Sequence, residues 1–66
     1  MHKLYIQFTN GNEGYYRYEK EGFAYVGSIR EGADFPSRTA AIAKARRMIS
    51  AGYRIAYYEA VYSSGR

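Results

Sequence analysis

The sequence predicts an α+β fold in which an antiparallel β-sheet of about four strands, in the order β-β-β-α-β, packs one amphipathic helix on one face. Three segments alternate apolar and polar residues, and an aromatic run lies between the first two of them. Turn-forming residues separate the first three of these four segments, and an alanine-rich segment lies before the fourth. A chain of 66 residues buries only about 60% of its unfolded surface, which suffices for one core. We therefore expect a single domain over residues 1–62 and a flexible tail at 63–66.

The first three strands are predicted from alternation and from the turns between them. Residues 3–9 alternate, and residues 10–14 read Asn-Gly-Asn-Glu-Gly, which tolerate the positive φ angles of a tight turn. The aromatic run at 15–19 favours a second strand, so the two strands should form a hairpin. A third strand is expected at 23–29, followed by a loop at 30–36. The residues expected to face the core from the first strand are Leu4, Ile6 and Phe8.

The helix is predicted to begin after Pro36 and to end at Gly52. Proline disfavours helix in the residue before it, and the Ser37 hydroxyl can accept a bond from a free backbone N–H of the first turn. Glycine favours the left-handed conformation that commonly follows a helix. The apolar stripe that should face the sheet consists of Ala41, Ile42, Ala45, Met48 and Ile49.

The last strand is expected at residues 53–62. Alternation places Ile55, Tyr57 and Val61 on one side, which we expect to face the core, and Glu59 shares that side. We therefore expect a bulge, a frayed edge or an exposed end near Glu59. One helix covers only one face of a four-stranded sheet, so the other face is left to solvent, a second copy or a ligand.

The residue inventory argues against an enzyme and against any metal or other cofactor. The chain has no cysteine and one histidine, so neither a disulfide framework nor the usual four-ligand zinc site is expected. His2 lies beside the amino terminus, where we expect an exposed strand end. The carboxylates that are close in sequence flank a turn (Glu19 and Glu21) or lie in a loop (Glu31 and Asp34), which indicates a solvated surface.

The amino-terminal residues alternate polar and apolar side chains where an export signal would show a continuous apolar run. No stretch is long enough and apolar enough to suggest a membrane span. We expect a cytoplasmic protein with no membrane partner and no small-molecule substrate.

The net charge of +4 is concentrated in the predicted helix. Residues 37–52 contain no acidic residue, while basic and acidic residues balance in the rest of the chain. Such a helix could line a polyanion, although basic residues near a helix C-terminus are also favourable through the helix dipole alone. The basic candidates for contact with phosphates are Lys44, Arg46 and Arg47, to which we add Arg17 in the second strand.

Nine tyrosines and three phenylalanines exceed what one small core needs. Tyr5 is expected to point outward because it lies between Leu4 and Ile6. For Tyr15, Tyr16 and Tyr18 the alternation leaves the inward side open. Surplus rings could stack on bases, contact a protein, form a homodimer interface or complete the core.

Two short segments resemble the motifs of the RNA-recognition-motif family. Residues 22–26, Gly-Phe-Ala-Tyr-Val, are similar to the centre of its octapeptide motif, and residues 4–6 are similar to the opening of its hexapeptide motif. The 13 residues between Phe8 and Gly22 leave no room for the helix that follows the first strand in the family. The resemblance implies base stacking by Tyr5, Phe23 and Tyr25.

In size and layout the chain also resembles small accessory proteins of phages and mobile elements, including anti-CRISPR proteins. The main hypothesis is a non-catalytic module that binds nucleic acid or a nucleic-acid-containing host protein complex through the basic helix and the tyrosines. The resemblance implies an alternative, a phage-type inhibitor that blocks a host complex in the host cytoplasm by protein contact. A homodimeric structural module is a further alternative.

Overall fold

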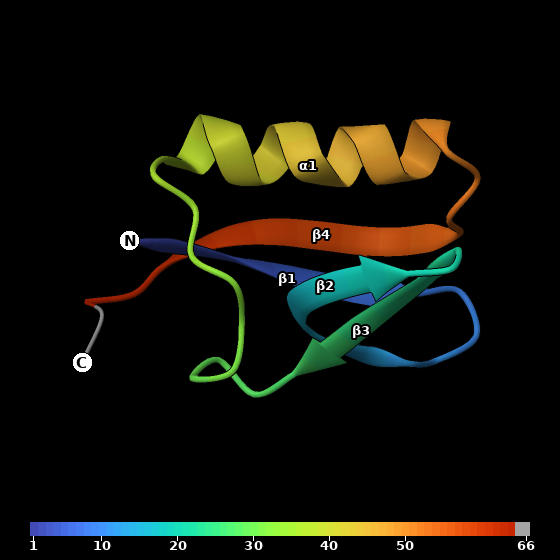
Figure 1. Cartoon of the computed structure of the whole chain (residues 1–66), viewed down its shortest axis with the longest axis horizontal. Coiled ribbons are helices and arrows are strands. Elements are labelled where there is room, and N and C mark those ends of the chain that lie inside the picture. Colours follow the sequence, from blue (N-terminus) through green and yellow to red (C-terminus); the bar gives the residue numbers. More distant parts are fainter. Residues whose placement is uncertain (65–66) are drawn as a thin grey trace.

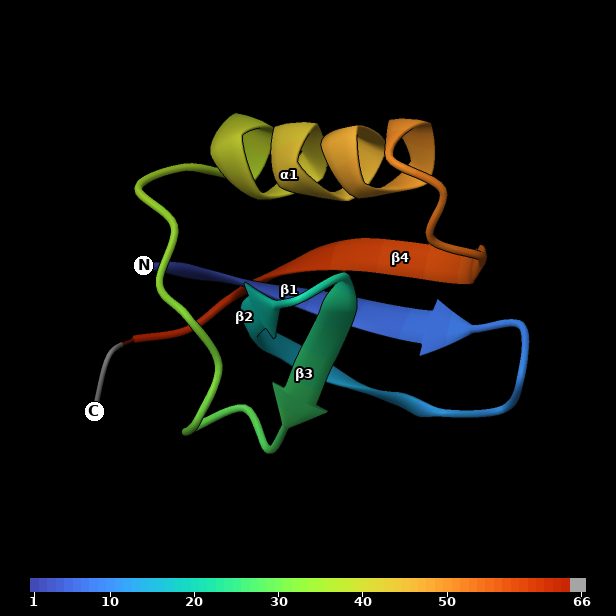
Figure 2. The same cartoon turned by 45° about the vertical axis from the view of Figure 1, so that its right-hand side comes forward.

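A computed structural model describes residues 1–64 and confirms the predicted α+β fold. The sheet order is β3-β2-β1-β4, and all neighbouring strands are antiparallel. Both views show α1 running alongside β4 and β1 on one face of the sheet, with the β2–β3 hairpin turned away (Figures 1 and 2). The elements are β1 (His2–Phe8), β2 (Glu13–Lys20), β3 (Phe23–Gly27), α1 (Arg38–Ser50) and β4 (Ile55–Tyr62).

The helix has the predicted ends. Ser37 is the N-cap, and its Oγ accepts a hydrogen bond from the Ala40 backbone N–H at 3.1 Å. Gly52 follows the last turn with φ of +106°, a conformation that costs little for glycine. Of the predicted stripe, Ala41, Ala45 and Met48 are buried and Ile42 is half-buried, but Ile49 is 44% exposed. The prediction was wrong for Ile49, because the buried arc of α1 is narrower than the stripe.

A bulge in β4 changes which of its side chains face the core. Gln7 pairs with Tyr57 and the next residue, Phe8, pairs with Ile55, so Ala56 is an extra residue. Ile55, Tyr58 and Ala60 therefore pack against the core. The predicted inward side of this strand was wrong for Tyr57 and Val61, which share the outer face with Glu59. The expected irregularity exists, but it lies at residue 56.

The connection between β3 and α1 fills a gap where β2 and β1 diverge. The backbones of His2 and Phe35 exchange two hydrogen bonds of 3.0 and 2.8 Å, and the Ala33 N–H donates to the Tyr16 carbonyl at 2.8 Å. The same connection covers Lys3, which is only 6% exposed. Its Nζ ion-pairs with Asp34 at 2.8 Å and donates to a backbone carbonyl at 2.7 Å. The buried ammonium thus has both a counter-charge and a hydrogen-bond acceptor.

The core lies between α1 and the inner face of β1, β2 and β4. At the sheet's end, Met1 and Ser63 exchange backbone hydrogen bonds of 3.0 and 2.7 Å, and His2 is half-buried against the ring of Tyr62 rather than exposed. Residues 65–66 of the predicted tail lie outside the described residues. The buried side chains of the core are Leu4, Ile6, Tyr16, Ala41, Ala45 and Met48.

Within residues 1–64, no helix reaches the length and apolarity that a membrane crossing requires. The 13-residue α1 includes four basic side chains, and its outer side is correspondingly polar.

Candidate functional site

A groove runs between α1 and the free edge of β4. Its helical wall is formed by Arg38, Ile42 and Arg46, which recur every four residues and so share one side of the helix. Its other wall is the central part of β4, the edge strand of the sheet. The groove has a volume of about 610 Å³. We call it the arginine groove, and its lining consists of Arg38, Ile42, Arg46, Tyr57, Tyr58, Glu59 and Ala60.

The arginine groove has an excess of positive charge. Among residues 1–64, neither Arg38 nor Arg46 has an ion-pair partner, and both side chains are exposed. The only carboxylate of the lining belongs to Glu59, which accepts a hydrogen bond from the Tyr57 hydroxyl at 2.8 Å. That bond raises the pKa of the Tyr57 phenol. Two guanidinium groups thus face one carboxylate that is already hydrogen-bonded.

Lys44 does not join this surface. Its ammonium ion-pairs with Glu19 of β2 and lies 5.3 Å from the centre of the Tyr16 ring. The bond to Lys44 lowers the pKa of the Glu19 carboxyl, and the same bond raises the pKa of Lys44. Lys44 therefore fastens α1 to β2 and is not free for a phosphate. Arg47 is exposed in the last turn of α1, where its charge complements the helix dipole.

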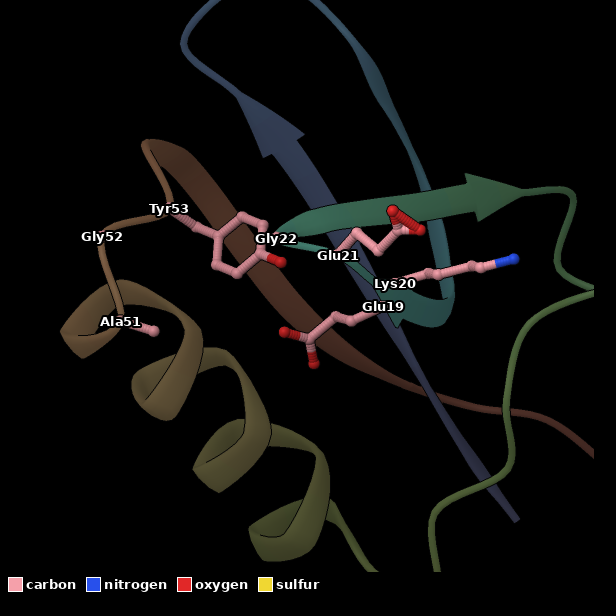
Figure 3. A pocket seen from close by; sticks show the side chains of 7 residues that line it. All are labelled: Glu19, Lys20, Glu21, Gly22, Ala51, Gly52 and Tyr53. Carbon is pink, nitrogen blue, oxygen red and sulfur yellow. The ribbon is translucent and has the colours of Figure 1, made fainter.

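A second pocket, of about 370 Å³, lies between the β2–β3 turn and the end of α1. Figure 3 shows the Glu19 carboxylate pointing toward the helix and Tyr53, while Lys20 and Glu21 point away from them. Glu19 already ion-pairs with Lys44 and accepts a hydrogen bond of 3.1 Å from the Tyr16 hydroxyl. Its carboxylate therefore holds the helix against the sheet, and we do not take this pocket as the candidate site.

The face of the sheet opposite α1 bears a cluster of tyrosines. The ring of Tyr5 meets Tyr15 of β2 at 5.4 Å and Tyr57 of β4 at 6.4 Å between centres, both edge to face. The Tyr5 hydroxyl donates to Glu13, and it accepts a bond of 3.0 Å from the Gln7 amide. We call this surface the tyrosine face. It consists of Tyr5, Gln7, Glu13, Tyr15, Tyr57 and Glu59, the last two of which also border the arginine groove.

The remaining predicted contact residues lie at the other edge of the sheet. Tyr25 of β3 stacks on Tyr18 at 4.8 Å, and the Arg17 guanidinium lies 5.5 Å from the centre of the Tyr18 ring. Phe23, beside the β2–β3 turn, is 68% exposed. Because β2 lies between β1 and β3, the structure does not bring Tyr5 together with Phe23 and Tyr25.

Sequence reasoning missed Arg38 and Tyr57 as groove residues. The spacing of four between Arg38, Ile42 and Arg46 was a readable signal for one shared helix side. No such signal existed for Tyr57, because its outward direction depends on the bulge in β4.

The Glu19–Lys44 pair should make stability depend on acid. The folded-state pKa of Glu19 lies below its ordinary value of 4.5. The ion pair therefore stabilises the fold fully above about pH 4.5, and this stabilisation is lost as the pH falls through the lowered pKa. We expect Glu19→Gln to flatten the loss of stability below about pH 4.5 in urea unfolding. Glu21→Gln removes a neighbouring carboxylate that has no ion pair among residues 1–64 and is the control. If the free energy of unfolding falls equally with decreasing pH in the wild type and in Glu19→Gln, this role is contradicted.

Within residues 1–64, no three His, Asp or Glu side chains gather as a possible metal site. Comparison of the chain with protein-family models, with curated proteins and with solved structures finds no match.

Proposed function

We propose that this domain is a non-catalytic binding module that holds single-stranded nucleic acid, free or within a nucleoprotein complex, in the arginine groove. The observation that supports this most strongly is the placement of Arg38 and Arg46 on one side of α1 without partners among residues 1–64. Eight residues of helix separate them by about 12 Å. They are too far apart to share one phosphate, so each would contact a different phosphate of an extended strand.

The opposite wall of the groove supplies a ring on which a base can stack. Tyr57 is 48% exposed at the edge of the sheet, whereas its neighbour Tyr58 packs against the core. Stacking on an aromatic ring is worth about 1–3 kcal/mol per base and tolerates any base. A strand whose phosphates contact α1 would turn its bases toward β4. This geometry favours a single strand, because the bases of a duplex are stacked on each other.

The proposal is tested by fluorescence anisotropy with a labelled oligothymidylate of about 16 nucleotides, titrated at salt concentrations from about 50 to 200 mM. Two phosphate contacts predict a slope of log affinity against log salt of about −1.4 or steeper. A duplex of equal length should bind more weakly. An affinity that does not change over this salt range, or one that is higher for the duplex, would contradict the proposal.

A further inference from the structure

The domain contains an internal arrangement in which a tyrosine, a carboxylate and a cation combine. The Tyr16 hydroxyl donates to Glu19 at 3.1 Å, and Lys44 ion-pairs with that same carboxylate. The Lys44 ammonium also lies 5.3 Å from the centre of the Tyr16 ring. The cation is therefore held both by the carboxylate and by the negative face of the ring.

The tyrosine face repeats the first two parts of this arrangement twice. The Tyr5 hydroxyl donates to Glu13, and the Tyr57 hydroxyl donates to Glu59 at 2.8 Å. Both carboxylates are exposed. Among residues 1–64, no lysine or arginine ion-pairs with either carboxylate or lies over the rings of this face. Neither the Tyr5–Glu13 pair nor the Tyr57–Glu59 pair therefore has the cation that completes the internal arrangement among residues 1–64.

The described cations of the same sheet face are engaged elsewhere. Lys3 is buried in its ion pair with Asp34. The Arg17 guanidinium lies over the Tyr18 ring. Hydrogen bonds from Ser28 are the main cause of the lowered pKa of Glu31, and the charge of Arg17 lowers it further. Within the described part of the chain, these two cations are therefore committed to other contacts, and we look to another molecule for the cation of the tyrosine face.

The spacing of the two carboxylates indicates what kind of molecule this is. Glu13 lies on β2 opposite Gln7 of β1, and Glu59 lies on β4 opposite Tyr5. Because Tyr5 and Gln7 are two residues apart on β1, the two glutamates are offset by two residues along the strands as well as by two strand spacings. Their backbone positions are therefore about 12 Å apart. A small free cation satisfies only one of them, whereas basic side chains about four residues apart on an extended chain share one face and span this distance.

We propose that the tyrosine face binds a basic segment of a partner protein, with one arginine or lysine side chain received by Tyr5 and Glu13 and another by Tyr57 and Glu59. The sign of the charge separates this surface from the arginine groove, which is built for an anionic ligand. Tyr57 and Glu59 border both surfaces, so the two activities are distinguished by the residues that belong to one surface only, Glu13 for the tyrosine face and Arg38 with Arg46 for the arginine groove.

The test is a titration of a labelled oligo-arginine peptide, with an uncharged glycine-serine peptide of the same length as the control probe. The arginine peptide should bind, and the uncharged peptide should not. Combined Glu13→Gln and Glu59→Gln substitutions should weaken peptide binding about tenfold, since charge-assisted bonds are lost while the shapes of the side chains are kept. The control Glu21→Gln, away from this face, should leave the affinity unchanged.

Two further variants test the contribution of the ring. Tyr57→Leu should weaken peptide binding several-fold through loss of the aromatic face, whereas Tyr57→Phe keeps the ring and should lose less. Because Tyr57 is 48% exposed, both variants should fold, which circular dichroism verifies. Equal affinities for the leucine and phenylalanine variants would overturn the proposed contact between cation and ring.

Oligonucleotide binding by the same variants separates the two surfaces. Glu13→Gln should leave it intact, and Arg38→Ala with Arg46→Ala should leave peptide binding intact. Three results would overturn the inference: no peptide binding by the wild type, undiminished peptide binding by the Glu13 and Glu59 double variant, or loss of oligonucleotide binding in Glu13→Gln. Self-association of the wild type that disappears in the double variant would also overturn it, because the occupant would then be a second copy.

Discussion

Replacing Met48 with alanine is expected to remove most of the stability of this domain. Met48 is 1% exposed and lies where α1 meets the sheet, in contact with the small core around Leu4 and Ile6. Truncation of such a residue costs about 2–5 kcal/mol through lost burial and the cavity that remains. A single core in a domain of this size rarely supplies more than about 3–5 kcal/mol. Urea unfolding of the variant should therefore begin at very low denaturant concentration.

The matched control is Ile49→Ala, one residue further along α1. Ile49 is 44% exposed, so its truncation should cost about 1 kcal/mol or less. The comparison is direct because apolar periodicity assigns both residues to the same stripe. Similar losses in the two variants would show that the helix is rotated relative to the packing described above. A mild effect of Met48→Ala would show that the core is centred elsewhere.

The combined substitution Arg38→Ala and Arg46→Ala is expected to have the largest effect on nucleic-acid binding. Removing two phosphate contacts should make the salt slope for an oligothymidylate shallower by about 1.4 and lower the affinity at least about tenfold at low salt. Both side chains are exposed and neither has an ion pair among the described residues, so the fold should persist. Anisotropy titrations at several salt concentrations measure the slope, and circular dichroism verifies the fold.

The control for this variant is Lys20→Ala with Arg30→Ala. This control also removes two positive charges, but from the β2–β3 hairpin and the loop that follows β3. Both positions belong to the end of the sheet order that is opposite to β4. Its salt slope should stay close to that of the wild type. If both double variants lose the same affinity, binding follows net charge alone, and the assignment of the arginine groove is contradicted.

The elements of this fold could be predicted from the sequence because each depends on local patterns. The alternation in residues 3–9, the turn cluster at 10–14 and the cap at Ser37 act within a few residues of themselves. Periodicity also identified Ala41, Ala45 and Met48 as buried. The same reasoning extended the third strand to residue 29, whereas β3 ends at Gly27, because the backbone turns there into the connection that leads to α1.

Features that depend on pairing between distant segments could not be predicted. The inward side of β4 was assigned incorrectly because the bulge at Ala56 arises from its pairing with Phe8 of β1. The burial of Lys3 depends on a loop about thirty residues away in the sequence, and the position of that loop in the fold could not be predicted from local patterns. Local alternation has no information about either contact.

The candidate site shows the same division. Composition located the positive charge on α1, and Arg46, which the sequence analysis had proposed for contact with phosphates, lines the arginine groove. Lys44, equally basic in sequence, is held by Glu19 of β2, a contact set by the packing of helix against sheet. The sequence also predicted that Tyr5 would point outward, but not that its hydroxyl would bind Glu13. That partner gives the tyrosine face a negative charge, which favours cations over phosphates.

In the proposed complex, nucleic acid lies along α1 and the edge of β4 and leaves the middle of the tyrosine face free. Chemical-shift mapping of the ¹⁵N-labelled protein with a short oligothymidylate tests this most directly. The largest changes should fall on residues 38–46 of α1 and on residues 57–60 of β4. Changes concentrated on Tyr5, Glu13 and Tyr15, or on the β2–β3 hairpin, would contradict the account.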